Sequence, residues 1–122
     1  MKIGFIGLGT MGASMAANLQ KSQYKLVVTD VRRDAAKQHL ENGAEWADSP
    51  KAIAEQCDIV FTSLPGPPEV EKVVFGEDGI LAGAHPGMAY FDLSTNSQAL
   101  MRRVNAALAE KGAFGFDAPV SG

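Results

Sequence analysis

The sequence predicts an α/β domain in which six strands form a mostly parallel sheet with helices on both faces. Short apolar runs alternate along the chain with longer stretches of helical periodicity, which is the pattern of repeated strand–helix–strand units. The run Lys25–Thr29 (KLVVT) is apolar on both sides, as strands inside parallel sheets are. The 122 residues contain no linker, low-complexity segment or repeat, so we expect one domain.

The expected strands are short and rich in β-branched or aromatic residues. They are Lys2–Ile6, Lys25–Thr29, Ala44–Ala47, Asp58–Ser63, Met88–Leu93 and Gly112–Phe116. The fourth ends in Leu64–Pro68, a proline-rich loop that cannot continue a hydrogen-bonded ladder.

The expected helices begin or end at residues that favour such ends. They are Thr10–Lys21, Asp34–Asn42 with Gly43 as its C-terminal cap, a helix opened by Ser49 and Pro50, Glu69–Phe75, and a helix behind the capping box Thr95–Gln98. Met11 and Met15 recur at helical spacing, so we expect both to face the core. His39, in the middle of the second helix, is expected on the surface.

Composition excludes several classes of protein. The 11 Lys and Arg residues against 14 Asp and Glu argue against a nucleic-acid partner, whose contact surface would be basic. No apolar stretch approaches the ~20 residues of a membrane span. Only Met1 and Lys2 precede the apolar residues of the first strand, so we expect no secretory signal. The single cysteine, Cys57, and two histidines make a poor disulfide or metal set. We therefore expect a cytoplasmic protein without a metal.

A glycine-rich motif lies between the first predicted strand and the first predicted helix. Residues 7–12, Gly-Leu-Gly-Thr-Met-Gly, fit G-x-G-x-x-G. In that pattern Gly7 permits a tight turn, Gly9 lets the backbone approach a pyrophosphate, and Gly12 lets the helix lie close to the strand. The helix N-terminus then offers N–H groups to the phosphates. A strand-to-helix turn that merely favours glycine is the alternative.

Asp30 ends the second strand, about 18 residues after Gly12, close to the spacing of a ribose-binding carboxylate. Such a carboxylate accepts hydrogen bonds from the ribose hydroxyls and repels the 2′-phosphate of NADP by a few kcal/mol at an effective dielectric of about 20. Arg32 and Arg33 follow, and an arginine here can accommodate that phosphate. A solvated helix start explains the two arginines equally well. We expect NAD as the cofactor, with NADP use open.

Four segments together resemble the N-terminal domain of the β-hydroxyacid dehydrogenases. They are residues 1–19 (MKIGFIGLGTMGASMAANL), Ser63–Pro65 (SLP), Phe91–Thr95 (FDLST) and Phe116–Gly122 (FDAPVSG), in matching order. The family includes 3-hydroxyisobutyrate dehydrogenase and 2-hydroxy-3-oxopropionate reductase, and the resemblance covers the whole chain. It implies a Rossmann-type doubly wound fold and an oxidoreductase that oxidises a small 3-hydroxy acid, or reduces the semialdehyde, with NAD or NADP.

The resemblance also implies which residues form the site. The cofactor contacts would be Gly7, Leu8, Gly9, Thr10, Met11, Gly12, Asp30, Arg32, Leu64, Pro65 and Thr95, and the substrate carboxylate would be held by Ser121 and Gly122. Thr95 would sit by the nicotinamide ribose with Ser94 beside it, although a helix cap explains Thr95 as well. Ser121 and Gly122 also read as ordinary turn residues. Glu69 is better explained as an acid favoured by a helix N-terminus.

The chain departs from the family in having no catalytic residue. The family's general acid/base is a lysine on a helix beyond the substrate segment, and no lysine of this sequence corresponds to it. We therefore expect residues 1–122 to be a dinucleotide-binding domain, incomplete at its C-terminal end and separated from a helical substrate and dimerisation domain. Such a domain would bind a dinucleotide, transfer no hydride, and expose an apolar patch. The full-length protein is expected to be a homo-oligomer.

Two alternatives remain open at this point. The chain could be a dinucleotide-binding module without chemistry, which the missing lysine favours. It could also belong to a related reductase of the 6-phosphogluconate or imine-reducing type. The Asp-Ala-Pro-Val-Ser-Gly ending and the lack of a basic cluster for a sugar phosphate count against this second reading.

Overall fold

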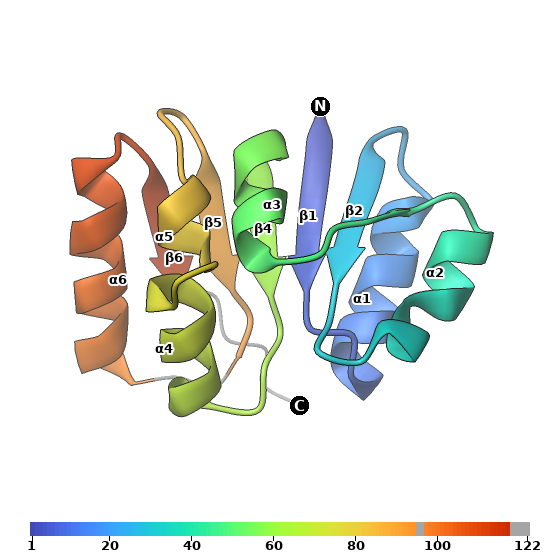
Figure 1. Cartoon of the computed structure of the whole chain (residues 1–122), viewed down its shortest axis with the longest axis horizontal. Coiled ribbons are helices and arrows are strands. Elements are labelled where there is room, and N and C mark those ends of the chain that lie inside the picture. Colours follow the sequence, from blue (N-terminus) through green and yellow to red (C-terminus); the bar gives the residue numbers. More distant parts are fainter. Residues whose placement is uncertain (95–96, 118–122) are drawn as a thin grey trace.

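The computed structural model describes residues 1–94 and 97–117, and in this part of the chain six parallel strands form one sheet (Figure 1). The strand order is β3-β2-β1-β4-β5-β6. The strands are β1 (Lys2–Ile6), β2 (Lys25–Thr29), β3 (Glu45–Trp46), β4 (Ile59–Thr62), β5 (Ala89–Asp92) and β6 (Phe114–Asp117). This confirms the predicted doubly wound fold. The order reverses between β1 and β4, and ligands of such sheets bind at that switch point, outside the carboxyl ends of the strands.

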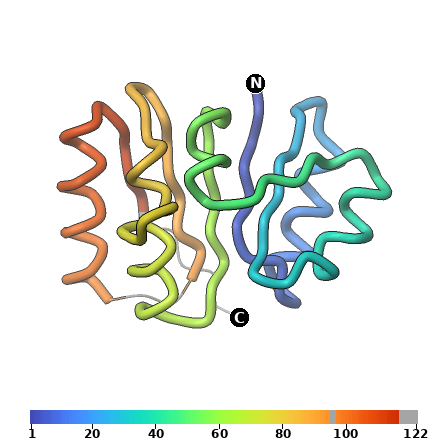
Figure 2. Tube along the Cα trace, viewed as in Figure 1, coloured from blue at the N-terminus to red at the C-terminus, as the bar shows by residue number. Residues whose placement is uncertain are grey.

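Helices cover both faces of the sheet. They are α1 (Thr10–Gln20), a 3₁₀ turn (Arg33–Ala36) continued by α2 (Lys37–Glu41), α3 (Pro50–Gln56), α4 (Pro67–Phe75), α5 (Ile80–Gly83) and α6 (Gln98–Glu110). Figures 1 and 2 show α1 and α2 beside β1 and β2, with α4, α5 and α6 over the other half of the sheet. None of the helices in the described ranges has the length and apolar character that crossing a bilayer requires.

Several helices differ from the prediction. The α4 helix begins at Pro67 rather than at Glu69, because a proline in the first turn loses no helical hydrogen bond. The second predicted helix opens as a 3₁₀ turn, and Gly43 follows it at a φ of 102°. The α5 helix was not predicted, since four residues are too few to show a helical period.

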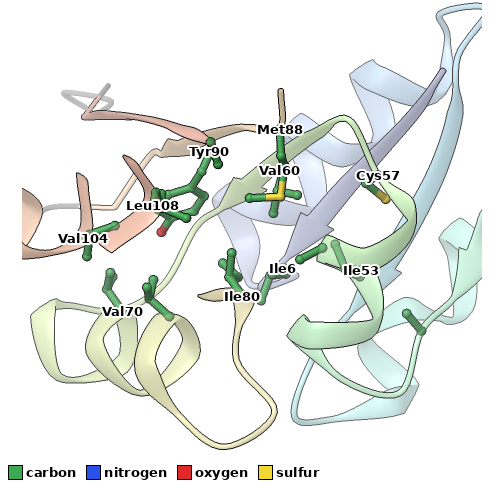
Figure 3. Packing of buried hydrophobic residues seen from close by; sticks show 14 of the residues in the cluster. Ile6, Ile53, Cys57, Val60, Val70, Ile80, Met88, Tyr90, Val104 and Leu108 are labelled. Atoms are coloured by element: carbon green, nitrogen blue, oxygen red, sulfur yellow. The ribbon is translucent and has the colours of Figure 1, made fainter. Parts of the chain in front are cut away.

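The main core lies between the sheet and α3 to α6 (Figure 3). Residues such as Val60 and Tyr90 from the strands meet Ile53, Val104 and Leu108 from the helices, and all five are fully buried. Cys57 belongs to the same cluster and is also fully buried. Burial raises the pKa of its thiol to about 12, which disfavours the reactive thiolate form.

The opposite face of the sheet is only partly covered. There Phe5, Phe61, Phe91 and Phe116 occupy successive register positions on β1, β4, β5 and β6, and their ring centroids are 6.0, 5.3 and 4.9 Å apart. Phe5 is buried with the residues of α1, whereas Phe116 is 47% exposed. An apolar patch therefore lies open over β4 to β6 among the described residues.

Two predictions were wrong, one about which residues of helix α1 face the core and one about the cap of α6. Met11 is 43% exposed, because the face of α1 that meets the sheet consists of the small residues Gly12 and Ala16, while Met15 is half-buried against the core. The capping box was predicted to start at Thr95, but α6 begins at Gln98 and Ser97 is its cap. The Ser97 hydroxyl oxygen accepts from the backbone N–H of Leu100 at 3.0 Å.

His39 was predicted on the surface and is instead 5% exposed. The reason is a reciprocal pair with Gln20 on α1: His39 Nδ1 donates to Gln20 Oε1 at 3.1 Å, and Gln20 Nε2 donates to the His39 carbonyl at 3.0 Å. The pair satisfies the polar groups that packing α2 onto α1 takes out of water.

His39 makes the stability of the fold depend on pH. Burial lowers its pKa below the ordinary 6.5, so the unfolded chain takes up this proton at a higher pH than the folded protein does. The free energy of unfolding should therefore fall as the pH drops through 6.5. Urea unfolding of the unaltered chain and of His39→Gln at several pH values measures this. We expect a shallower pH dependence in His39→Gln, with His85→Gln as the control. Equal slopes in all three proteins would contradict it.

Candidate functional site

The turn between β1 and α1 is built by two glycines whose backbones pack closely. Gly7 has a φ of 96°, and its N–H donates to the Thr29 carbonyl at 3.1 Å. A Cβ atom on Gly7 would collide with the carbonyl oxygen of Ser63, and one on Gly12 would collide with the carbonyl oxygen of Gly7. No larger residue fits at either position without movement of the backbone. The absence of side chains there is what brings the first turn of α1 against β1.

Gly9, between them, faces the other way. It is exposed, and a Cβ atom built on it would have nothing within 4 Å. Gly9 is also the N-cap of α1, and no side chain caps this end of the helix. The N–H groups of the first turn, which includes Thr10 and Met11, are thus not covered by a capping side chain and carry the positive end of the helix dipole. This side of the turn has the shape and polarity for an anionic group such as a diphosphate.

Asp30 lies directly against this turn. Its Oδ2 accepts from the backbone N–H of Leu8 at 2.6 Å and its Oδ1 accepts from the N–H of Arg32 at 2.9 Å. The carboxylate thereby joins the end of β2 to the glycine turn. The Leu8 side chain is buried in the core beneath, so Leu8 presents only its backbone to the site. Asp30 therefore lies next to the glycine turn, as the sequence analysis predicts.

The two arginines after Asp30 are in different surroundings. The guanidinium of Arg33 lies 5.1 Å from the ring centroid of Trp46 and stacks on it as a cation–π pair. Arg32 is exposed at the start of the 3₁₀ turn, two residues after Asp30, and its backbone N–H donates to the Asp30 carboxylate. Of the two, Arg32 is the one that the structure leaves at the edge of the site.

The loop after β4 completes the edge. A Cβ atom on Gly7 would come within 3.0 Å of the Leu64 side chain, so Leu64 lies beside the glycine turn, and Pro65 follows it as an exposed residue. Glu69 is exposed in the first turn of α4, as the sequence argument places it. The predicted residues Thr95, Ser121 and Gly122 lie outside the described residues.

A buried polar cluster below this edge was missed by sequence reasoning. Thr62 and Asp92 end β4 and β5 in direct register, and Ser94 follows two residues later. The Thr62 hydroxyl donates to Asp92 Oδ1 at 2.9 Å, and the N–H of Ser94 donates to the same oxygen at 3.0 Å. The available signal was a Thr and an Asp at the ends of two otherwise apolar strands. Within residues 1–94 and 97–117, no group of three His, Cys, Asp or Glu could hold a metal ion.

Comparison with known proteins assigns the family. The family model described as the NAD binding domain of 6-phosphogluconate dehydrogenase matches residues 2–122. The chain belongs to this family of NAD-binding domains. Its cofactor class is therefore NAD(P).

The relatives of this NAD-binding domain are dehydrogenases and reductases. The chain is 39% identical to mouse mitochondrial 3-hydroxyisobutyrate dehydrogenase over 98% of its own length and 36% of that protein. It is 38% identical to Escherichia coli 2-hydroxy-3-oxopropionate reductase over its whole length and 41% of that protein. A solved structure, Psf3 in complex with NADP+ and 2-OPP, superposes with a TM-score of 0.91 at 33% identity, covering 98% of this chain and 43% of Psf3. The domain thus spans about two fifths of the length of the relatives it matches.

Proposed function

We propose that this NAD-binding domain is the cofactor part of an oxidoreductase that transfers hydride between a nicotinamide and a small 3-hydroxy acid or its semialdehyde. The observation that carries the proposal is the open glycine turn with Asp30 against it. The substrate class is supported by the two relatives named for 3-hydroxyisobutyrate and 2-hydroxy-3-oxopropionate. One domain over residues 1–122 is part of the same proposal.

In this proposal, the bound cofactor would extend along the carboxyl edge of the sheet and contact the ends of successive strands. Asp30, after β2, would accept hydrogen bonds from the adenosine ribose, and the N–H groups around Gly9, Thr10 and Met11, after β1, would bind the diphosphate. Leu64 and Pro65, after β4, would line the path beyond, toward Thr95 after β5. When bound, the nicotinamide supplies the hydride acceptor or donor.

The domain's own residues supply only part of a complete active site. Ser121 and the Gly122 backbone would hold the substrate carboxylate by O–H and N–H donors. A lysine from a segment beyond residue 122 would exchange the hydroxyl proton of the substrate, a general acid/base step worth about 10²–10⁴-fold. Lys2 and Lys25 do not serve, since both pair with Glu45 at the opposite, amino edge of the sheet, at 3.6 and 2.9 Å. Residues 1–122 alone should therefore bind cofactor without turnover.

The whole protein is proposed to add a helical domain that closes the substrate site and to act as a homo-oligomer. Nucleic acid and membrane are not among the proposed partners, in keeping with the net charge of −3. A cytoplasmic location is part of the same proposal.

Titration calorimetry of the 122-residue chain with NADH and NADPH tests the proposal. We expect saturable binding of one molecule of NADH, and no oxidation or reduction when hydroxyisobutyrate or a semialdehyde is added. Failure of both dinucleotides to bind at millimolar concentration would overturn the proposed function. Turnover by residues 1–122 alone would contradict the need for a lysine from outside them.

Asp30 should set the preference between the two cofactors. Asp30→Ala is expected to weaken NADH binding by roughly 10- to 100-fold, because a charge-assisted hydrogen bond to a ribose hydroxyl contributes roughly 1.5–3 kcal/mol. The variant should lose less affinity for NADPH, since the repulsion of the 2′-phosphate disappears with the carboxylate. Dissociation constants of both cofactors measure this. An unchanged ratio of NADH to NADPH affinity would remove Asp30 from the ribose site.

Asp30 also accepts a hydrogen bond from the glycine turn, and Asp30→Asn is the matched control for this second, structural role. Its amide oxygen can still accept from the N–H of Leu8, so the bond to the glycine turn is kept while the negative charge and the acceptor for the N–H of Arg32 are lost. We expect Asp30→Asn to improve NADPH binding relative to NADH without the general loss of affinity that loosening the turn adds in Asp30→Ala.

A further inference from the structure

The buried polar cluster at the ends of β4 and β5 forms a continuous chain of hydrogen bonds. The hydroxyls of Tyr90 and Thr62 lie 2.7 Å apart, and the single proton of Thr62 goes to Asp92 Oδ1, so Tyr90 is the donor in that pair. All three side chains are fully buried. We call Tyr90, Thr62, Asp92 and Ser94 the Asp92 network.

Because the network is buried among apolar residues, its polar groups are energetically costly if their only role is packing. Tyr90 belongs to the same apolar cluster as Val60, Met88 and Leu108, and a carboxyl group taken into such surroundings loses its hydration. Apolar residues of similar size generally hold buried strands together as well as, or better than, a buried polar group does. Packing of β4 against β5 therefore does not by itself explain why these residues are polar.

The explanation lies in where the chain of bonds ends. Asp92 Oδ1 accepts from the N–H of Ser94, which holds Ser94 at the start of the loop after β5. The Ser94 hydroxyl oxygen then accepts from the N–H of Leu64 at 2.7 Å, in the loop after β4. The network thus runs out of the core and ties the two loops to each other, and Ser94 itself is 4% exposed.

We propose that Asp92 is a positioning residue, which through Thr62 and Ser94 fixes the loops after β4 and β5 that receive the nicotinamide half of the cofactor. The role rests on the proposed function. The strand order β2-β1-β4-β5 puts Asp30 and the glycine turn on one side of the site and these two loops on the other. The network therefore supports the nicotinamide side, while the adenosine side depends on Asp30 and the turn after β1.

Binding of two probes to the 122-residue chain distinguishes the adenosine side of the site from the nicotinamide side. ADP carries the adenosine and the diphosphate only, whereas NADH adds the nicotinamide ribose and ring. Ser94→Ala removes the acceptor for Leu64 N–H, and we expect about tenfold weaker NADH binding with ADP binding within about twofold of the unaltered chain. Ser49→Ala is the matched control, because Ser49 Oγ likewise accepts a backbone N–H, that of Ala52, at the start of α3. It should change stability and leave the NADH-to-ADP ratio alone.

A second pair of variants covers the case in which Ser94→Ala does not fold. Thr62→Val keeps the shape and removes the hydroxyl, whereas Thr62→Ser keeps the hydroxyl. We expect Thr62→Val to lower the NADH-to-ADP affinity ratio and Thr62→Ser to restore it. If the unaltered chain binds NADH and the ratio is the same in all variants, the network is structural only and the inference is overturned. If the unaltered chain binds neither probe, the proposed function and this inference fall together.

Discussion

Gly9→Ala is expected to fold as the unaltered chain does and to lose NADH binding by on the order of 100-fold or more. A Cβ atom at Gly9 meets no protein atom within 4 Å, and the residue has an ordinary φ of −67°. The fold should therefore lose no more than about 1 kcal/mol, the usual difference between residues at a helix N-cap. Under the proposed function, the space that a methyl group would fill is the space through which the diphosphate would approach the backbone.

Chemical denaturation and calorimetry on the same sample measure these two effects separately. The contrast matters more than either number, because a loss of binding with intact stability locates the ligand at Gly9. Tight NADH binding by Gly9→Ala would show that the open side of the turn is not the diphosphate site.

Gly12→Ala is expected to act in the opposite way, through the fold itself. Its Cβ atom would collide with the carbonyl oxygen of Gly7 and come within 3.3 Å of the Phe5 ring. Helix α1 would have to move away from β1, and overpacking of this kind costs typically about 1–3 kcal/mol. The displaced helix would also no longer aim its N–H groups at the diphosphate, so NADH binding should be lost together with stability.

Thermal or urea unfolding of Gly12→Ala measures the cost. Ala13→Gly is a useful companion, since it adds a glycine one residue along α1 and destabilises the helix by its backbone alone, about 1 kcal/mol. If Gly12→Ala proved as stable as the unaltered chain and still bound NADH, the close approach of α1 to β1 would not be what that glycine provides.

Much of this site could be predicted because its elements are local in sequence. The turn from Gly7 to Gly12 joins two consecutive elements, and parallel βαβ connection places the end of β2 next to the end of β1. Asp30 therefore had to lie near the turn once the two strands were identified. The boundaries of β1 and β2 were predicted for the same reason, since each is a short apolar run flanked by turn residues.

The features that were missed depend on pairs far apart in the chain. His39 is buried because Gln20, 19 residues earlier, satisfies its polar groups, and a helix pattern alone shows His39 as an isolated polar residue. The Asp92 network depends on the register that puts Thr62 opposite Asp92, 30 residues on. One residue's shift in that register would turn one of the two side chains to the other face. Local sequence carries no information on such pairings.

Because Cys57 is buried, the reaction of its thiol with a labelling reagent reports local opening of the fold. A thiol whose pKa is raised to about 12 is almost never a thiolate at neutral pH, and this one is also shut off from solvent. A disulfide reagent added to the native protein can thus react only with molecules that have transiently come apart around α3 and β4. The rate at which this lone thiol is labelled therefore reports the frequency of opening, and bound cofactor, by stabilising the native state, should slow the labelling.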